Sequence, residues 1–399
     1  MNKKYLSIRN FDWMLLLAVL IIGCILDGCV PRSVDRSMQT DVIDTIEVFR
    51  QKIDRLQKEL HIPGMSVAIL KNRQIVFAKG FGYADVKDKI PAEANTPYNI
   101  ASLTKPFAAA VLMKLVEQGQ LDLDVEMAAI LKDTDFTFRD DTIHGYANAC
   151  AKIKKISKNP FLFYGFLIRN YRCDTEKITV RHHLTHTSQG IPGQTYRYNG
   201  FLFKFLTQVA EKVSSKSFDE LIVENVIAPL EMTRTVPGIN KDYQNQVLAD
   251  RAKYYRRGFW GNFVPSSYPA KLSASAGMIS TVIDLAKFDV AMDQNLIISK
   301  ETRQAMFTPA ISNSGKLLPY GLGWFVQEHK GLKLVWHYGH APKAYSSLIL
   351  KVPKEEATLI LLANSDGASA PFNLGAGNVF RSPFAVAFLN LFANLEDAP

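Results

Sequence analysis

The segment from Ala101 to Phe107 holds the most specific chemical pattern in this 399-residue chain. Ser102 and Lys105 stand at the start of an apolar run that continues to Gln118. On a helix, residues at this spacing share a face, so the lysine amine can reach the serine hydroxyl. A serine hydroxyl becomes a good nucleophile when a base takes its proton, and a desolvated lysine can be that base. The alternative is an ordinary helix start, with Ser102 as N-cap and Lys105 as a solvated charge.

Two later segments could complete a site around this pair. Tyr196-Arg197-Tyr198-Asn199-Gly200 precedes a predicted helix and offers phenolic oxygens. Trp336-His337-Tyr338-Gly339-His340 ends a predicted strand, where glycine would let a substrate lie close against the backbone. Taken alone, each segment is better explained as a turn or strand end with ordinary surface aromatics.

His182, His183 and His186 suggest zinc, because two pairs of these histidines have helical spacing. No acidic residue with metal-motif spacing accompanies them. We therefore predict no metal site here.

Length and composition indicate an ordinary globular protein. The hydrophobic content of 47% is sufficient for a large core, and the length favours about two domains or lobes. The formal net charge of +9 is spread along the chain. Because there is no basic helix, zinc-finger spacing or aromatic-basic platform, we predict no nucleic-acid partner. A moderately basic surface suits a protein that faces an anionic cell envelope.

The N-terminus is typical of an export signal. Lys3, Lys4 and Arg9 precede an apolar run over residues 13–26, which is short for a membrane-spanning helix. Cys24 and Cys29 each follow small residues in a pattern that resembles the lipobox of bacterial lipoproteins. We predict a leader over residues 1–29, a polar linker over 30–40 and an extracytoplasmic location, in the periplasm or at the cell surface, with a lipid anchor on one of these cysteines. An uncleaved membrane anchor is the alternative.

Cys150 and Cys173 are the remaining cysteines. In an oxidising compartment they could form a disulfide, and two buried free thiols are the alternative.

The order of patterns predicts how the chain is organised. Apolar residues from Val42 to Leu60 recur with helical spacing, and β-rich runs over 65–70 and 74–79 predict a hairpin. The middle is mostly helical, with one segment over 201–213, a capping box at Ser217 and Glu220, and a helix starting at Thr281. Strands return over 332–336, 346–352 and 357–363. We therefore predict a mixed, largely antiparallel sheet built from both chain ends and flanked by helices, with a mostly helical second lobe.

The three motifs together resemble a known family. Ser102-Leu103-Thr104-Lys105, Tyr198 and His337-Tyr338-Gly339 are similar, in order and spacing, to the motifs of serine β-lactamases and penicillin-binding proteins, and most of all to the class C β-lactamase-related group. The likeness covers roughly residues 45–365. Supporting segments are Ile62-Pro63-Gly64-Met65, Leu184-Thr185-His186-Thr187-Ser188, Ser275-Ala276-Gly277-Met278-Ile279-Ser280-Thr281 and Tyr320-Gly321-Leu322-Gly323-Trp324.

The resemblance implies a β-lactamase/transpeptidase-like α/β (α+β) fold, with a hydrolase domain over residues 41–399 and a helical insertion at about 133–177. It implies no metal or organic cofactor. Ser102 would be the nucleophile, with Lys105 and Tyr198 sharing the proton transfers. The backbone N–H groups of Ser102 and His340 would form the oxyanion hole, next to His337 and Gly339 on the substrate-binding strand.

Two departures from the family pattern bear on activity. Gly200 stands where the second motif commonly has an asparagine, unless Tyr196 is the catalytic phenol and Tyr198 takes the amide position. His337 replaces a lysine and is mostly neutral at pH 7, although its charged form could bind carboxylates as the pH falls towards about 6. Both departures argue against an efficient β-lactamase.

The expected function is an exported serine hydrolase that cleaves small-molecule esters or peptide amides, with esterase-like or D-amino-peptidase-like activity. A D-alanyl-D-alanine carboxypeptidase acting on cell-wall peptides, or a weak β-lactamase, is the alternative. A catalytically weak binding or scaffold protein that kept the fold is the alternative from another class.

Overall fold

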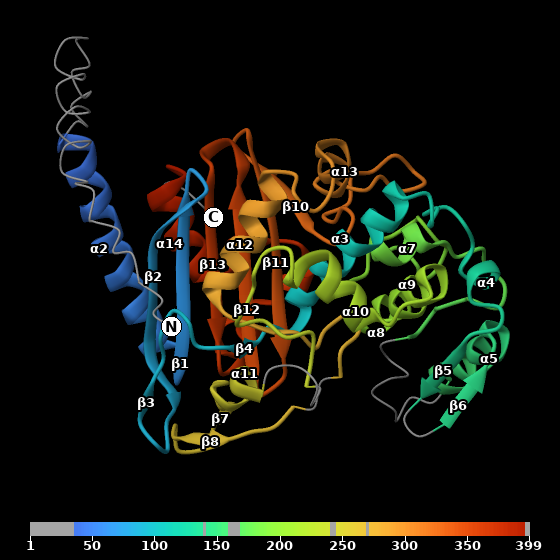
Figure 1. Ribbon diagram of the computed structural model, residues 1–399, viewed down its shortest axis with the longest axis horizontal. Helices are drawn as coiled ribbons and strands as arrows, with labels where there is room; N and C mark the ends of the chain where they lie inside the picture. The colour runs from blue at the N-terminus through green and yellow to red at the C-terminus, as the bar shows by residue number, and fades with distance from the viewer. Residues whose placement is uncertain (1–35, 139–140, 159–167, 240–244, 269–270, 396–399) are drawn as a thin grey trace, which may run out of the picture. The chain divides into compact units, whose positions relative to one another are not determined.

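The computed structural model describes residues 36–138, 141–158, 168–239, 245–268 and 271–395 (Figure 1). The predicted leader, with Cys24 and Cys29, lies outside these residues. The chain divides between Val48 and Phe49 into two compact units, and helix α2 (Arg36–Glu59) runs across this boundary. Within the described part of the chain, no helix combines the length and the apolar character needed to cross a membrane.

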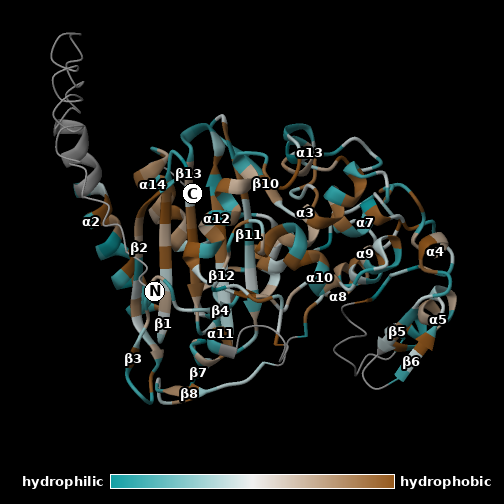
Figure 2. Cartoon of the chain, in the orientation of Figure 1, coloured by the Kyte–Doolittle hydropathy of each residue, from teal (hydrophilic) through white to brown (hydrophobic). Residues whose placement is uncertain are grey.

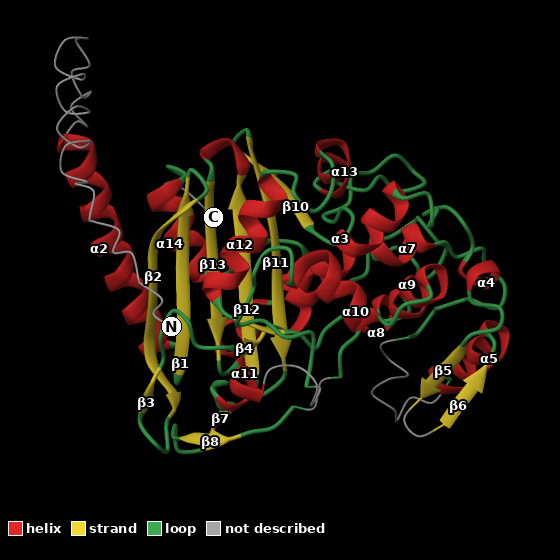
Figure 3. Ribbon diagram, viewed as in Figure 1, coloured by secondary structure: helices red, strands yellow, loops and turns green. Residues whose placement is uncertain are grey.

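A seven-stranded sheet forms the centre of the unit that begins at Phe49 (Figure 3). Every neighbouring pair in it is antiparallel. Strand β1 pairs with β13 in register from Met65–Ala363 to Lys71–Ala357, so the two ends of the chain meet in mid-sheet, as the sequence predicts. In spatial order the strands are β10 (Phe325–His329), β11 (Leu332–Ala341), β12 (Tyr345–Val352), β13 (Ala357–Ala363), β1 (Gly64–Lys71), β2 (Gln74–Asp85) and β3 (Ile90–Pro91).

Both faces of this sheet are covered, so the central strands β12 and β13 are buried along their whole length, and most of their residues are apolar (Figure 2). Because side chains alternate between the faces of a strand, Val67 and Ile69 enter one core and Ala68 and Leu70 enter the other. The first core also contains residues of helix α14 (Pro383–Phe392) and the Phe49 turn of α2. Helix α12 (Val282–Asp293) and helix α3 (Thr104–Glu117) contribute to the second core.

The middle of the chain forms short helices, as predicted, with one correction. The segment expected as a single helix over 201–213 is divided into α8 (Gly200–Phe203) and α9 (Leu206–Ser214). The N–H groups of Phe205 and Thr207 each bond to a carbonyl three residues back, so a tighter turn interrupts the α-helical pattern. Further helices in the middle of the chain include α4 (Met127–Ile130), α7 (Val180–Leu184), α10 (Phe218–Ile222) and α11 (Asn245–Ala249).

The helix starts predicted from capping residues are confirmed. Ser217 and Glu220 form a reciprocal capping box at α10. The Thr281 hydroxyl accepts the Asp284 N–H at 3.1 Å at the start of α12.

The described residues of the segment over 133–177 are less helical than expected. It begins with a hairpin of β5 (Asp135–Phe138) and β6 (Asp141–His144), followed by helix α5 (Tyr146–Ser157). Cys150 and Cys173 form a disulfide with their Cα atoms 5.7 Å apart, which decides between the two alternatives left open by the sequence.

Candidate active site

Ser102 lies in a short 3₁₀ turn, η1 (Ala101–Leu103), that leads directly into α3. The N-cap of this turn is Ile100, so Ser102 is not a capping residue. Ala101 has φ +49°, a left-handed conformation that L side chains rarely adopt. The Thr104 hydroxyl donates to the Ala101 carbonyl at 2.8 Å and fixes this turn. The Ser102 N–H lies in the first turn, where backbone N–H groups have no carbonyl partner within the helix.

The lysine predicted to activate Ser102 has its amine in contact with the serine hydroxyl. Lys105 Nζ lies 2.8 Å from Ser102 Oγ and 2.9 Å from the carbonyl oxygen of Ser275. The Lys105 side chain is completely buried, and this desolvation lowers its pKa to about 7. A large fraction of the amine is therefore neutral near pH 7 and can accept a proton. The solvated-charge alternative is wrong.

Strand β11 runs beside the serine turn, which is also bonded to β12 through the Ser347 hydroxyl and the Ile100 carbonyl at 2.7 Å. Strand β10 pairs with β11 only as far as Trp336. From His337 to Ala341, strand β11 pairs with β12 and no longer with β10. A Cβ at Gly339 would lie 2.4 Å from the Ile100 carbonyl oxygen and 2.1 Å from Ser347 Oγ. Glycine is thus needed so that β11 can approach η1, which corrects the expectation that its role is to make room for substrate.

The same approach brings the predicted oxyanion donors into neighbouring segments. Gly339 lies against Ala101, so the residues that follow them, His340 and Ser102, also stand in adjoining backbone. The His340 side chain is partly exposed, with Nε2 3.8 Å from Asp366 Oδ2. The oxyanion hole itself remains a prediction.

Of the two candidate phenols, Tyr198 is the one beside Ser102 and Lys105. Lys105 Nζ lies 5.1 Å from the centre of the Tyr198 ring. The Tyr198 hydroxyl is buried, with the Ser102 hydroxyl as its neighbour. Burial and the neighbouring Tyr338 raise the pKa of Tyr198 well above its usual value, while the Ser102 hydroxyl acts in the opposite direction. The Tyr196 hydroxyl instead donates to the Gly375 carbonyl at 3.1 Å, which disfavours the shifted alignment of the second motif.

Gly200 lies where a second-motif amide would reach the lysine. A Cβ placed on Gly200 would lie 3.6 Å from Lys105 Nζ, an ordinary contact distance. The neighbouring Asn199 cannot substitute, because its Oδ1 accepts the Leu202 N–H at 3.1 Å and its Nδ2 donates to Gln189 at 2.8 Å. A side chain at position 200 would therefore lie against the amine.

His337 is completely buried and neutral. Its Nδ1 donates to the Tyr338 carbonyl at 2.8 Å, which leaves Nε2 to accept from the Tyr320 hydroxyl at 2.9 Å. Burial, with a smaller effect from Lys105, lowers its pKa well below the usual value. The expectation that a charged His337 binds carboxylates near pH 6 is therefore not supported by its surroundings.

The three neighbouring histidines serve contacts other than metal binding. His182 Nδ1 accepts the Thr179 N–H, and His183 bonds to the Leu202 carbonyl and the Tyr171 hydroxyl. In the described residues there is no cluster of side chains suited to a metal ion.

His186 is the site residue that the sequence analysis did not single out for this role. Its carbonyl accepts the Arg197 N–H at 2.8 Å, and its Nδ1 accepts the Asn199 N–H at 3.2 Å. These two bonds hold the backbone on both sides of Tyr198, whose ring centre lies 4.5 Å from that of the imidazole. Burial lowers the His186 pKa well below its usual value, so the ring is neutral. In the sequence, the only sign of this role is that His186 stands in the segment Leu184 to Ser188, which resembles the family.

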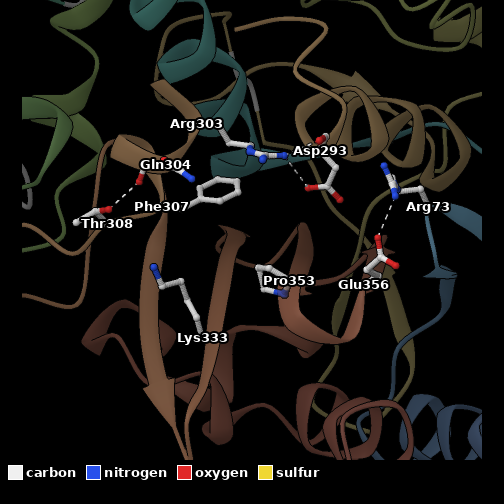
Figure 4. Close-up of a pocket in the computed structure, with 9 residues that line it drawn as sticks. All are labelled: Arg73, Asp293, Arg303, Gln304, Phe307, Thr308, Lys333, Pro353 and Glu356. Carbon is white, nitrogen blue, oxygen red and sulfur yellow. Dashed lines mark hydrogen bonds and ion pairs between the residues drawn. The ribbon is translucent and has the colours of Figure 1, made fainter. Parts of the chain in front are cut away.

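A separate cavity of about 570 Å³ lies at the opposite end of β11 (Figure 4). It contains none of the predicted site residues. Its charges are largely paired, since Arg73 contacts Glu356 at 3.1 Å and Arg303 contacts Asp293 at 3.7 Å. The lining residues are Arg73, Asp293, Arg303, Gln304, Phe307, Thr308, Lys333, Pro353 and Glu356.

With this geometry established, comparison with known proteins identifies the family. The family model described as Beta-lactamase matches residues 49–380, a range that contains every predicted site residue. The chain belongs to the beta-lactamase family. Among sequence relatives, a penicillin-binding protein of Bacillus subtilis (strain 168) is 25% identical over 77% of this chain and 69% of its own length. Protein flp of Staphylococcus aureus (strain N315) is 26% identical over 81% of this chain, and the match spans 64% of that protein.

Solved structures share the fold of this chain. The octameric penicillin-binding protein homologue from Pyrococcus abyssi is 26% identical, with a TM-score of 0.66 over 86% of this chain and 77% of its own. The D-amino acid amidase from Ochrobactrum anthropi SV3 is 19% identical, with a TM-score of 0.64; the match covers 88% of this chain and 99% of the amidase. EstCE1, a hydrolase with promiscuous acyltransferase activity, is 17% identical, with a TM-score of 0.59; the match covers 86% of this chain and 99% of EstCE1. The last two likenesses concern the fold alone.

We predict that Tyr198→Phe lowers kcat for ester hydrolysis by roughly two to four decades, the usual effect of removing a positioned acid–base group. Tyr196→Phe is the matched control and should stay within a few-fold of the wild type, because its hydroxyl bonds to Gly375. Steady-state kinetics on a p-nitrophenyl ester would decide. A damaging Tyr196→Phe with a harmless Tyr198→Phe would reverse the assignment.

His186→Leu should lower kcat by about one to two decades, since it leaves the buried Asn199 N–H unpaired beside Tyr198, a loss of about 1–3 kcal/mol. In His186→Asn the amide oxygen can accept the same N–H, so most of the activity should return. Both variants lose the ring, and thermal unfolding would separate the loss of stability from the loss of kcat. If both lost activity equally, the role of His186 would be packing alone.

The pH profile should follow the Lys105 amine. Because its pKa is lowered to about 7, and the neutral amine is the form that accepts a proton, kcat/KM should rise as the pH increases through about 7 and then level off. The measurement is ester hydrolysis from pH 5 to 9, corrected for the rate with a Ser102→Ala variant. A rate that falls over this rise in pH would contradict the assignment of Lys105 as base.

Proposed function

We propose that this protein is an exported serine hydrolase that cleaves esters or amides through an acyl-enzyme on Ser102. The observation that carries the proposal is the Lys105 amine, which is buried, has a lowered pKa and lies 2.8 Å from the serine hydroxyl. A scaffold protein has no need to retain such a group, because burying an amine without an ion pair costs stability.

The geometry suggests a division of the proton transfers. Lys105 accepts the Ser102 proton as Oγ attacks the substrate carbonyl carbon, and the N–H groups of Ser102 and His340 receive the developing oxyanion. Tyr198 has a raised pKa and keeps its proton, so it suits protonation of the leaving oxygen or nitrogen and can then recover a proton from Lys105. Water repeats the sequence on the acyl-enzyme and releases the acid.

The surroundings of the site favour uncharged acyl groups. The neutral His337 and the missing amide at Gly200 remove two groups that would hold a β-lactam by its carboxylate and acyl side chain. Aromatic rings dominate the walls beside Tyr198. They belong to His186, Phe203, Tyr320, Phe325 and Tyr338. The structural likenesses to an amidase and to EstCE1 are compatible with this choice.

A peptidase acting on cell-wall peptides is the second candidate. The penicillin-binding relatives favour it, together with the export-type leader that would place the enzyme outside the cytoplasm. It would use the same residues, so a substrate panel is the means of separating it from an esterase.

Ser102→Ala tests the nucleophile. This variant should lose labelling by a fluorophosphonate probe completely and keep its fold, because Ser102 lies within the turn and caps no helix. Gel fluorescence measures the labelling, and thermal unfolding provides the control for folding. Labelling that survives in the variant, or that never occurs in the wild type, would sink the proposal.

Substrate preference is the second test. We expect kcat/KM for a p-nitrophenyl ester to exceed that for a chromogenic cephalosporin, since each missing charge-assisted hydrogen bond is worth about 1.5–3 kcal/mol, or roughly one to two decades. Gly200→Asn supplies the absent amide where the structure has room for a Cβ. This variant should lower the ratio of kcat/KM for the ester to kcat/KM for the cephalosporin about tenfold. Cephalosporin turnover equal to or above the ester rate in the wild type would restore the β-lactamase.

A further inference from the structure

A small hairpin carries the two most exposed aromatic side chains of the described residues. Strands β7 (Tyr255–Arg257) and β8 (Phe263–Pro265) pair in antiparallel register. At the tip between them, Phe259 is 91% exposed and Trp260 is 88% exposed. The two rings meet edge to face with centroids 5.0 Å apart. Large aromatics normally contribute to a core or an interface, and these two contribute to neither within the described chain.

The tip has a defined turn. The Gly258 N–H donates to the Asn262 carbonyl at 2.8 Å, and the Gly261 N–H donates to the Gly258 carbonyl at 3.1 Å. Gly261 has φ +78°, which favours glycine at this position of the turn. The backbone therefore holds the two rings outward.

The base of the hairpin is anchored in the body of the protein. The Tyr255 N–H donates to the Asn364 carbonyl at 2.9 Å, and the Tyr255 hydroxyl donates to Asp85 at 3.0 Å. The Tyr254 hydroxyl also donates to Asn99 Oδ1. A firmly held base under an exposed tip is a suitable arrangement for inserting side chains into a surface.

The charge around the tip has one dominant sign. From Arg251 to Ile283 the sequence contains five basic residues and no acidic residue. Arg256 and Arg257, directly before the tip, are both exposed. The β2–β3 turn, which adds the exposed Lys87 and Lys89 and one acid, Asp88, is joined to the hairpin by the Val86 N–H on the Tyr255 hydroxyl at 2.8 Å.

We propose that this hairpin tip, Gly258 to Asn262, inserts into the headgroup region of an anionic phospholipid membrane. Trp and Phe rings partition into that region, and adjacent arginines gain from the negative surface potential. A lipid surface requires no complementary groove, which suits two rings that project from a narrow turn. The inference does not rest on the proposed hydrolase activity. It would provide a second attachment beside the predicted N-terminal anchor, and stable membrane association commonly needs two.

Tryptophan fluorescence of the full chain in vesicles tests this contact. Trp324 and Trp336 are buried, and Trp13 is common to all variants, so the difference between the wild type and Trp260→Phe isolates the Trp260 signal. The vesicles contain brominated lipids as quenchers. They are made either of phosphatidylcholine alone or of phosphatidylcholine with phosphatidylglycerol.

The Trp260 signal should be quenched strongly in the anionic vesicles and weakly in the neutral ones. Replacing both Arg256 and Arg257 by Ser should lower the equilibrium constant for tip insertion about 30-fold, since each basic residue near the surface is worth about 1 kcal/mol. Leu296→Ser, a change at another exposed apolar residue, is the matched control and should leave the quenching unchanged. Ester hydrolysis in detergent should be the same in all variants, which separates this test from that of the hydrolase.

The proposal is overturned if Trp260 stays unquenched in anionic vesicles, as expected for a tip that binds a protein or a glycan. Equal quenching in neutral vesicles, or in the variant without the two arginines, would also overturn it, because binding would then not depend on anionic lipid.

Discussion

Desolvation of a single amine is the constraint on which the site depends. Lys105 is placed at the start of α3 with its side chain entirely enclosed, and its pKa falls because water no longer solvates the ammonium form. Among the described residues no carboxylate pairs with it, in contrast to Lys351, which is equally buried but bonds to Asp289 at 2.7 Å and Asp293 at 2.9 Å. Those carboxylates raise the pKa of Lys351 and keep it charged. The two lysines show how the choice of partner makes one a structural cation and gives the other an amine that can accept a proton near pH 7.

Enclosing Lys105 requires elements from distant parts of the chain. Ser275 supplies a carbonyl, and the ring of Phe203 lies 5.3 Å from the amine. Strand β11 completes the wall, and it can do so only because Gly339 allows it to approach Ile100 and Ala101. The left-handed conformation of Ala101 is part of the same arrangement, since strained backbone persists where its surroundings determine it. Substitutions that loosen this packing would let water reach the amine and return its pKa towards that of a free lysine.

Sequence patterns predicted the features that depend on local spacing. The Ser102–Lys105 contact follows from helical geometry, the helix start at Thr281 from its side-chain cap, and strands β1 and β13 from β-branched apolar runs. The pairing of the two chain ends followed from the order of these elements.

Features that depend on tertiary contacts could not be predicted in this way. The hydrogen bond by which His186 holds the Tyr198 segment joins residues 13 positions apart, and the one between Tyr320 and His337 joins residues 17 positions apart. The interruption between α8 and α9 and the hairpin at 135–144 lack a distinct local signal. The sequence indicated that glycine at position 339 allows a close approach, but the group that approaches it is the serine turn and not a substrate. In each case the sequence supplied the residue, and its surroundings determined the role.

The electrostatic character of the site follows from these surroundings. His186 and His337 are both buried near Lys105, and its charge lowers the pKa of each in addition to desolvation. Both imidazoles are therefore neutral, with directed hydrogen bonds, and they add no further positive charge beside the amine. A second cation there would lower the Lys105 pKa further, whereas a carboxylate would raise it and protonate the base. A neutral polar wall avoids both effects and holds Tyr198 in place, at the expense of affinity for substrates that carry a carboxylate.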